Sequence, residues 1–279
     1  MKNLPDKYSA VWVSHSSMGD FLKCRRLYYL HNMYKNPKTG KKLSIVSPHM
    51  SLGVAVHEVL EGLGQYKAED RMKRDLLADY EKAWSKVTGR IGGFKTPEEE
   101  AEFKARGKRM IENVIKDPRM LPNKIVKLPK EKMNPNFYID IEQNIILNGL
   151  VDWIEYLPET DSIHIVDFKT GKNEEQEASL QLPIYLLLCN ALQKRKVSKA
   201  TYWYLESDKL VEKELPDADK AKVDVLEVAR KVKAFRTGGD FTCANGPAGC
   251  FHCEQYEKIL RGEAEFVGVG NFGQELYLL

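Results

Sequence analysis

Long apolar segments and the features of an export signal are both missing from this sequence. No run of about 18 apolar residues occurs, so we expect no membrane-spanning helix. The first residues, MKNLPDKYSAVWV, contain no apolar stretch of the roughly 7–15 residues found in signal peptides. Linkers and low-complexity tracts are missing as well. We therefore expect a soluble, cytoplasmic protein without a membrane partner.

The net charge is small, and the sequence contains few cysteines. The formal net charge is only +3, so overall charge does not by itself indicate a nucleic-acid-binding protein, and an anionic partner needs a local basic patch. Five cysteines in a cytoplasmic chain favour free thiols or metal ligands over disulfides. With 279 residues and 43% hydrophobic content, we predict a single globular domain over residues 1–279.

Helical periodicity dominates the first half of the chain. Apolar faces predict one helix over residues 16–33 and another over residues 51–66, where His57 and Glu61 are one turn apart. Charged helical segments follow over residues 69–117. We interpret residues 66–130 as a helical insertion.

Strand periodicity begins near residue 137. The stretches FYIDIEQNIILNGLVDWIEYL and IHIVDFKTGK predict a β-meander, and EASLQLPIYLLLCNAL (residues 177–192) predicts a buried helix in which Cys189 is a core residue. A strand at ATYWYLES, a shorter one at KLVEKEL and a helix over residues 218–235 come next. This order predicts an α/β fold with a mixed central sheet and a cysteine-bearing C-terminal segment over residues 240–279.

The triplet Asp167-Phe168-Lys169 ends one of the predicted strands. Residues two apart on a strand point to the same face, so Asp167 and Lys169 project together. A solvated strand end has the same pattern, but Asp152 precedes the neighbouring strand and a hairpin register brings it beside Asp167. Two adjacent carboxylates repel unless a cation lies between them, and oxygen ligands suit Mg²⁺ or Mn²⁺. The pair therefore indicates a divalent-metal site suited to phosphodiester hydrolysis.

Five motifs, in this order, resemble the RecB-like branch of the PD-(D/E)xK nucleases, which includes Cas4-type and phage exonucleases. The first comprises the two N-terminal stretches SHSSMGDFLKCRRLYYL and GVAVHEVLEG. The other four are GLVDWIEYL, IVDFKTGK, QLPIYLL and the terminal CFHC. The resemblance implies a restriction-endonuclease-like core in which His57, Asp152, Asp167 and the Phe168 carbonyl hold the metal. It also implies that Lys169 is the catalytic lysine, and that Gln181 and Tyr185 form the Q-x-x-x-Y motif beside the substrate.

Other interpretations of three of these residues stay open. A single histidine on an apolar helix is often a core residue, and this applies to His57. Gln181 and Tyr185 either contact substrate or support the other site residues, and Tyr185 lies in an apolar run typical of a core.

Four of the cysteines are expected to meet at one metal centre. Cys24 lies near the N-terminus, and Cys243, Cys250 and Cys253 lie within eleven residues near the C-terminus. In iron–sulfur members of the resembling family, one N-terminal and three C-terminal cysteines hold a [4Fe–4S] cluster. Those members carry a further cysteine after the C-x-x-C, which this sequence lacks, so tetrahedral Zn²⁺ and free thiols are the alternatives.

The function predicted from these motifs is a Mg²⁺- or Mn²⁺-dependent DNA nuclease, an exonuclease acting on single strands or duplex ends. DNA is the expected partner, with recombination, repair or replication proteins as further partners. A basic N-terminal stretch that includes Arg26, Lys41 and Lys42 is expected to contact phosphates, and Tyr28, Tyr29 and Tyr34 to stack on bases. The alternatives are a non-catalytic nucleic-acid-binding protein and a recombination or integration accessory protein.

Overall fold

The computed structural model describes residues 5–129, 133–173 and 179–279. The helices are α1 (His15–Lys23), α2 (Arg25–Tyr28), α3 (Pro48–Gly62), α4 (Ala68–Arg71), α5 (Leu76–Trp84), α6 (Pro97–Lys116), α7 (Gln181–Leu192), α8 (Ala218–Gly238) and α9 (Phe251–Leu260), with a π-helical turn η1 (Tyr29–Met33) and 3₁₀ turns η2 (Leu63–Gln65), η3 (Gly89–Gly92) and η4 (Gly246–Ala248). The strands are β1 (Val11–Val13), β2 (Leu43–Ile45), β3 (Asn136–Asp140), β4 (Ile145–Asn148), β5 (Trp153–Leu157), β6 (Ser162–Lys169), β7 (Val197–Tyr204), β8 (Lys209–Lys213), β9 (Glu265–Val269) and β10 (Glu275–Leu278).

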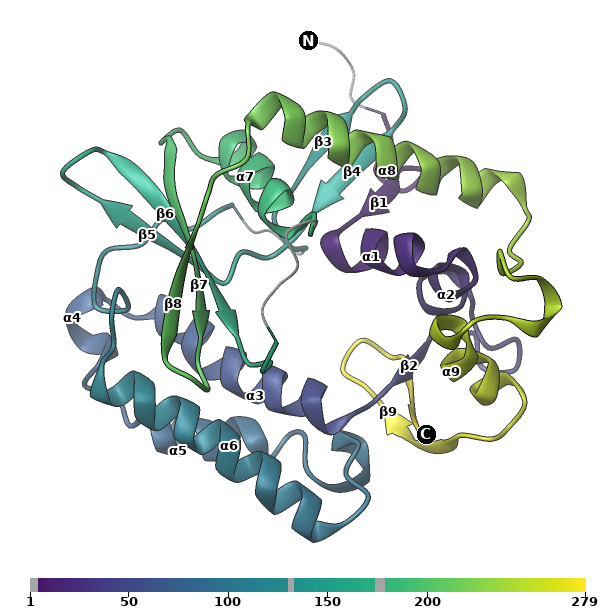
Figure 1. Cartoon of the computed structure of the whole chain (residues 1–279), viewed down its shortest axis with the longest axis horizontal. Helices are drawn as coiled ribbons and strands as arrows, with labels where there is room; N and C mark the ends of the chain where they lie inside the picture. The colour runs from purple at the N-terminus through teal and green to yellow at the C-terminus, as the bar shows by residue number, and fades with distance from the viewer. Residues whose placement is uncertain (1–4, 130–132, 174–178) are drawn as a thin grey trace.

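A four-stranded mixed sheet in the order β5-β6-β7-β8 carries the Asp167-Phe168-Lys169 triplet. Strands β5 and β6 form an antiparallel hairpin, β6 and β7 are parallel, and β7 and β8 are antiparallel. In Figure 1, α3, α5 and α6 lie on one side of this sheet and α7 lies on the other. The α/β fold class and the mixed sheet predicted from the sequence are confirmed.

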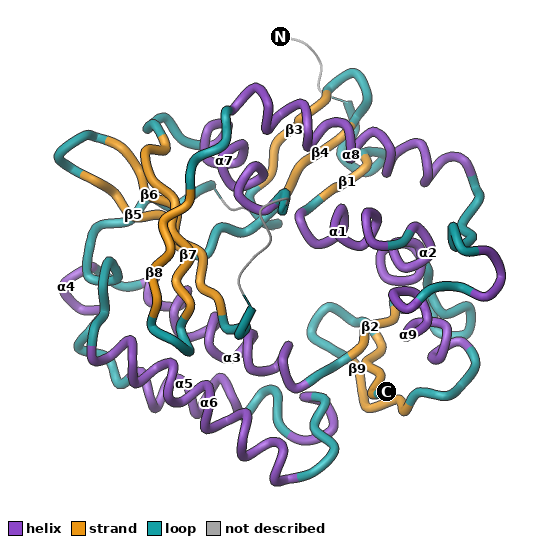
Figure 2. The backbone as a smooth tube through the Cα atoms, viewed as in Figure 1, coloured by secondary structure: helices purple, strands orange, loops and turns teal. Residues whose placement is uncertain are grey.

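Two smaller sheets lie outside the central one (Figure 2). The first has the order β1-β4-β3, in which β1 runs parallel to β4. The second has the order β2-β10-β9 and joins the C-terminal end of the chain to the segment just before α3. The predicted continuous meander is therefore wrong in one respect: the chain changes sheets between β4 and β5, and Gly149–Asp152 forms the connection.

Strand β6 contributes to two hydrophobic cores because its side chains alternate between the two faces of the sheet. Ile163 and Ile165 belong to the core that α1, α7 and α8 cover. Val166 and Phe168 belong to the core that α3, α5 and α6 cover. A third cluster, which contains Cys24 and four buried residues of the C-terminal segment, packs α2 against α9.

The N-terminal helix predicted over residues 16–33 is not continuous. Cys24 has extended backbone angles (φ −165°, ψ 126°), so α1 ends and α2 begins at this residue. The apolar face continues through the break, but Cys24 takes part in the third core cluster beside Cys243 and Cys253. Tertiary packing therefore overrides the local helical preference.

The helices predicted over residues 51–66, 177–192 and 218–235 are present with adjusted ends. Residues 177 and 178 lie outside the described residues, and α7 begins at Gln181 with Pro183 in its first turn. Cys189 is buried, as predicted. The segment predicted as an insertion contains α4, α5 and α6, which bury one face of the sheet; its status as an insertion stays a prediction. Within the described residues, every helix is too short or too polar to cross a bilayer.

Candidate functional site

The end of α3 and the start of β5 bring three metal-ligating side chains together. His57 and Glu61 are four residues apart on α3, so they lie on the same face of the helix. Asp152 approaches that face from the connection that enters β5. One ligand atom from each of these three residues lies within 4.8 Å of the others.

Local packing fixes the position of Asp152. Its Oδ2 atom accepts a hydrogen bond from the Phe168 backbone N–H at 2.8 Å and lies 3.6 Å from His57 Nδ1. The hairpin register pairs Trp153 with Val166, so Asp152 stands opposite Asp167 at the strand ends. Gly149 permits the connection to pass close to α7, since a Cβ there would lie 2.9 Å from Leu188 Cδ1.

Asp167 lies on the other side of this site and has a different set of partners. Its Oδ1 atom accepts hydrogen bonds from Gln181 Nε2 at 2.9 Å and from the Tyr185 hydroxyl at 3.3 Å. Lys169 Nζ lies 2.8 Å from Asp167 Oδ2 and donates to Gln181 Oε1 at 2.5 Å. The Lys169 ammonium also lies over the Tyr202 ring, 4.7 Å from its centre.

Gln181 and Tyr185, which the sequence places one turn apart, both support Asp167. The side chains of both residues are buried on α7, and Gln181 Nε2 donates to the Tyr185 hydroxyl at 3.1 Å. Through these bonds α7 orients the Asp167 carboxylate toward Lys169. Whether either residue also contacts substrate stays a prediction.

Asp152 lies in surroundings that oppose its ionisation. Burial, together with the charge of Asp167, raises the pKa of Asp152 from its ordinary value of 3.8 to about 8. Although burial opposes the charged imidazolium, the Glu61 hydrogen bond and the nearby carboxylates raise the pKa of His57 to about 9. Asp167 Oδ2 is buried, and its cationic partner is the Lys169 ammonium, 2.8 Å away. A bound divalent cation would offset the repulsion between the two carboxylates.

The donor set fits a divalent cation such as Mg²⁺ or Mn²⁺. Two or three carboxylates provide hard oxygen ligands, and one imidazole nitrogen suits Mn²⁺ better than Mg²⁺. His57 is not a core residue, because 27% of its side chain is exposed and Nδ1 lies 3.0 Å from Glu61 Oε1. Among the described residues the compact ligand group includes Glu61 and leaves Asp167 outside it.

Glu61 is the residue that the sequence interpretation missed as a candidate ligand. Its position one turn after His57 was visible in the sequence, but a His–Glu pair at this spacing is also common on helix surfaces. Only the approach of Asp152 to the same helical face distinguishes this pair.

The four cysteines predicted to meet do so, at the end of the molecule that joins α2 to α9. Their sulfur atoms all lie within 4.8 Å of one another. Cys24 Sγ is 3.7 Å from Cys243 Sγ, and Cys250 Sγ is 3.8 Å from Cys253 Sγ. A tetrahedral ion with Zn–S bonds of about 2.3 Å places its ligands about 3.8 Å apart, so this spacing fits a single zinc ion. A [4Fe–4S] cluster places four irons between the sulfurs and requires them to lie farther apart.

The thiols of this cluster differ in acidity. Although burial opposes a thiolate, the backbone N–H groups of Cys253 and His252 and the Cys24 thiol lower the pKa of Cys250 to about 7. Burial raises the pKa of Cys24, and it raises that of Cys253 to about 12. Of Cys24, Cys250 and Cys253, Cys250 therefore has the lowest pKa, and a bound metal ion would favour the thiolate form of all of them.

Most of the tyrosines expected to stack on bases have other roles. Tyr28 is buried, with 1% of its surface exposed, in the core that α1, α7 and α8 cover. Tyr29 stacks on Phe241 with ring centres 4.4 Å apart, and it lies 6.0 Å from the Tyr34 ring. Arg26, one of the basic residues expected to contact phosphates, forms an ion pair with Glu257 in which Nε and Oε1 are 2.6 Å apart. The predicted stacking role of Tyr28 is wrong, since intramolecular packing already covers its ring.

Comparison with known proteins agrees with this geometry. A family model described as the PD-(D/E)XK nuclease superfamily matches residues 12–257, which include His57, the β5–β6 hairpin and the cysteine cluster. No curated protein matches the sequence closely enough to count as a relative. The matched segment covers most of the chain, so this protein belongs to the PD-(D/E)XK nuclease superfamily.

Proposed function

We propose that this protein is a divalent-metal-dependent deoxyribonuclease that acts as an exonuclease on single strands or duplex ends. The observation that carries the proposal is the meeting of His57, Glu61 and Asp152 beside Asp167 and Lys169, with a raised Asp152 pKa. Nuclease chemistry follows from the family, and the choice of DNA and of strand ends rests on the resemblance to RecB-like enzymes.

In this proposal His57, Asp152, Asp167 and the Phe168 carbonyl hold Mg²⁺ or Mn²⁺, with Glu61 as an additional ligand. When bound, the ion would supply a more acidic water and would offset the charge of the phosphate. Lys169 is fixed between Asp167 and Gln181. Its ammonium either orients or deprotonates the attacking water, or donates to a phosphate oxygen and stabilises the charge that develops there. Gln181 and Tyr185 keep Asp167 in position by filling the acceptor sites of Oδ1.

The cysteine cluster belongs to the proposal as a structural metal centre. Cys24, Cys243, Cys250 and Cys253 would hold one centre that joins the N-terminal helices to the C-terminal segment. The sulfur spacing favours Zn²⁺, and the family resemblance favours [4Fe–4S]. If the anaerobically purified protein is colourless and contains one equivalent of zinc, the centre is a zinc site. If it is brown and contains iron, the centre is an iron–sulfur cluster.

Digestion of end-labelled DNA tests the nuclease proposal. Single-stranded and blunt double-stranded substrates are incubated with the purified protein, with Mg²⁺, Mn²⁺ or EDTA. The expected result is metal-dependent loss of the labelled end, abolished by Asp167→Asn and retained by Asp219→Asn, a change at an exposed aspartate on α8. Metal-dependent binding of DNA without cleavage would instead support the non-catalytic binding protein.

A further inference from the structure

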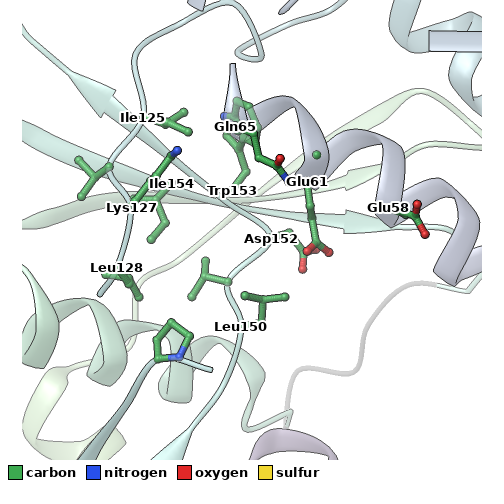
Figure 3. A pocket seen from close by; sticks show the side chains of 15 residues that line it. Glu58, Glu61, Gln65, Ile125, Lys127, Leu128, Leu150, Asp152, Trp153 and Ile154 are labelled. Atoms are coloured by element: carbon green, nitrogen blue, oxygen red, sulfur yellow. The ribbon is translucent and has the colours of Figure 1, made fainter. Parts of the chain in front are cut away.

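A pocket of about 470 Å³ opens directly beside the candidate metal ligands (Figure 3). Glu61 and Asp152 form one side of it, with their carboxylates next to each other in the figure. The segment just before β5 and the segment after α6 form the other walls. Its volume lies within the range of roughly 300–1,000 Å³ typical of small-molecule sites. The pocket and the metal group therefore share two side chains.

Apart from Lys127, the walls away from the carboxylates are mainly apolar. They are formed by Ile125, Leu128, Leu150 and Ile154, and Figure 3 shows Leu128 and Leu150 on the side opposite Ile125. Leu150, two residues before Asp152, is 37% exposed. Its side chain therefore offers apolar surface that a ligand in the pocket can cover.

The distribution of charge determines which part of a nucleic acid fits this pocket. Glu61 and Asp152 repel a phosphate wherever no cation offsets them, and Glu58, also in the lining, is ion-paired with Lys86. A nucleobase is uncharged and has two apolar faces, so it suits aliphatic walls. The exposed Lys127 on the opposite wall supplies a cation for a neighbouring phosphate.

We propose that this pocket holds the base of a nucleotide adjoining the phosphodiester bond that is cut. The inference rests on the proposed nuclease function and adds a subsite to it. A phosphate at the metal group fixes one end of the nucleotide, and the base fills the space between Leu128 and Leu150. The aliphatic walls contact any base, so the pocket positions the strand without selecting a sequence.

An abasic-site scan tests the subsite. End-labelled single strands, each with one tetrahydrofuran residue at a different position, are digested with Mn²⁺, and the cutting rate is measured at every bond. In the wild type we expect cutting to slow by about tenfold at a fixed offset from the abasic position, because the contact with one base is lost. Leu150→Trp and Leu128→Trp each fill the pocket, and in both the position effect should disappear.

Leu210→Trp is the matched control. Leu210 has the same exposed fraction as Leu150, 37%, but lies on β8, outside the pocket. This variant should keep the wild-type position effect. Uniform cutting of the abasic series by the wild type, or an unchanged effect in both pocket variants, would overturn the subsite while leaving the nuclease proposal intact. Absence of any cleavage by the wild type would overturn the nuclease proposal and the subsite together.

Discussion

Replacing Asp152 by asparagine should make the metal-free protein more stable while removing its response to metal. In the wild type, burial and the charge of Asp167 raise the pKa of Asp152 from 3.8 to about 8. A carboxyl group with a raised pKa binds its proton more tightly in the folded state than in the unfolded state. The free energy of unfolding therefore falls as the pH rises from about 4 to about 8. Asparagine has no ionisation and avoids this loss.

The size of the effect follows from the pKa shift of Asp152. A change of the Asp152 pKa from 3.8 to about 8 corresponds to about 6 kcal/mol against the ionised form. The attraction of His57 is already contained in this shift, because it is one of the influences that set the Asp152 pKa. We therefore expect Asp152→Asn to gain about 5 kcal/mol at most near pH 8 and almost none near pH 4.

Urea unfolding in EDTA at several pH values measures this difference. The variant should be more stable near pH 8, and the gap should close toward pH 4. Added Mg²⁺ or Mn²⁺ should stabilise the wild type and leave the variant unchanged, because only the wild type keeps the Asp152 carboxylate as a metal ligand. Asp219→Asn, at an exposed aspartate, serves as the control and should show no such pH-dependent gap. Equal stability of Asp152→Asn and wild type near pH 8 would refute the electrostatic reasoning.

Three further predictions concern the other groups of the site. Lys169→Ala should lower the cleavage rate by about 100-fold or more with little change in DNA affinity, measured by single-turnover kinetics and filter binding; a loss confined to affinity would contradict it. His57→Ala should raise the metal concentration needed for half-maximal cleavage, with better rescue by Mn²⁺ than by Mg²⁺; unaltered metal titration would make His57 a structural residue. Cys24→Ser should lose the metal detected by elemental analysis, while Cys189→Ala should retain it, because Cys189 lies in a separate core; equal metal content in both would remove the proposed centre.

The central hairpin and its acidic residues were predictable because two local signals agree. Strand alternation ends at Asp167-Phe168-Lys169, and the turn near residues 158–162 sets the register that faces Asp152 toward Asp167. The buried α7 was predictable from its apolar density. In these segments, local preference and tertiary packing favour the same structure.

The missed features depend on contacts between distant parts of the chain. The β9–β10 hairpin was not predicted, since β9 is short and largely exposed and therefore shows no apolar alternation. The break at Cys24 follows from cysteines more than 200 residues away, as the 219-residue separation from Cys243 shows. Glu61 is a candidate ligand only because Asp152, distant in sequence, approaches α3.

Strand β6 has a consequence for how the molecule unfolds. Its alternating side chains belong to two separate cores, one covered by α3 and the other by α7. The candidate ligands are divided between the same two sides of the sheet: His57 lies on α3, and Asp167 is held by Gln181 of α7. We expect the two sides of the sheet to open separately without metal, and an ion bound by both groups would link them. In EDTA, hydrogen exchange should show that α3 and α7 open with different free energies. In Mn²⁺, both helices should open with the same free energy, higher than either value in EDTA. Metal binding would in this way turn two cooperative units into one.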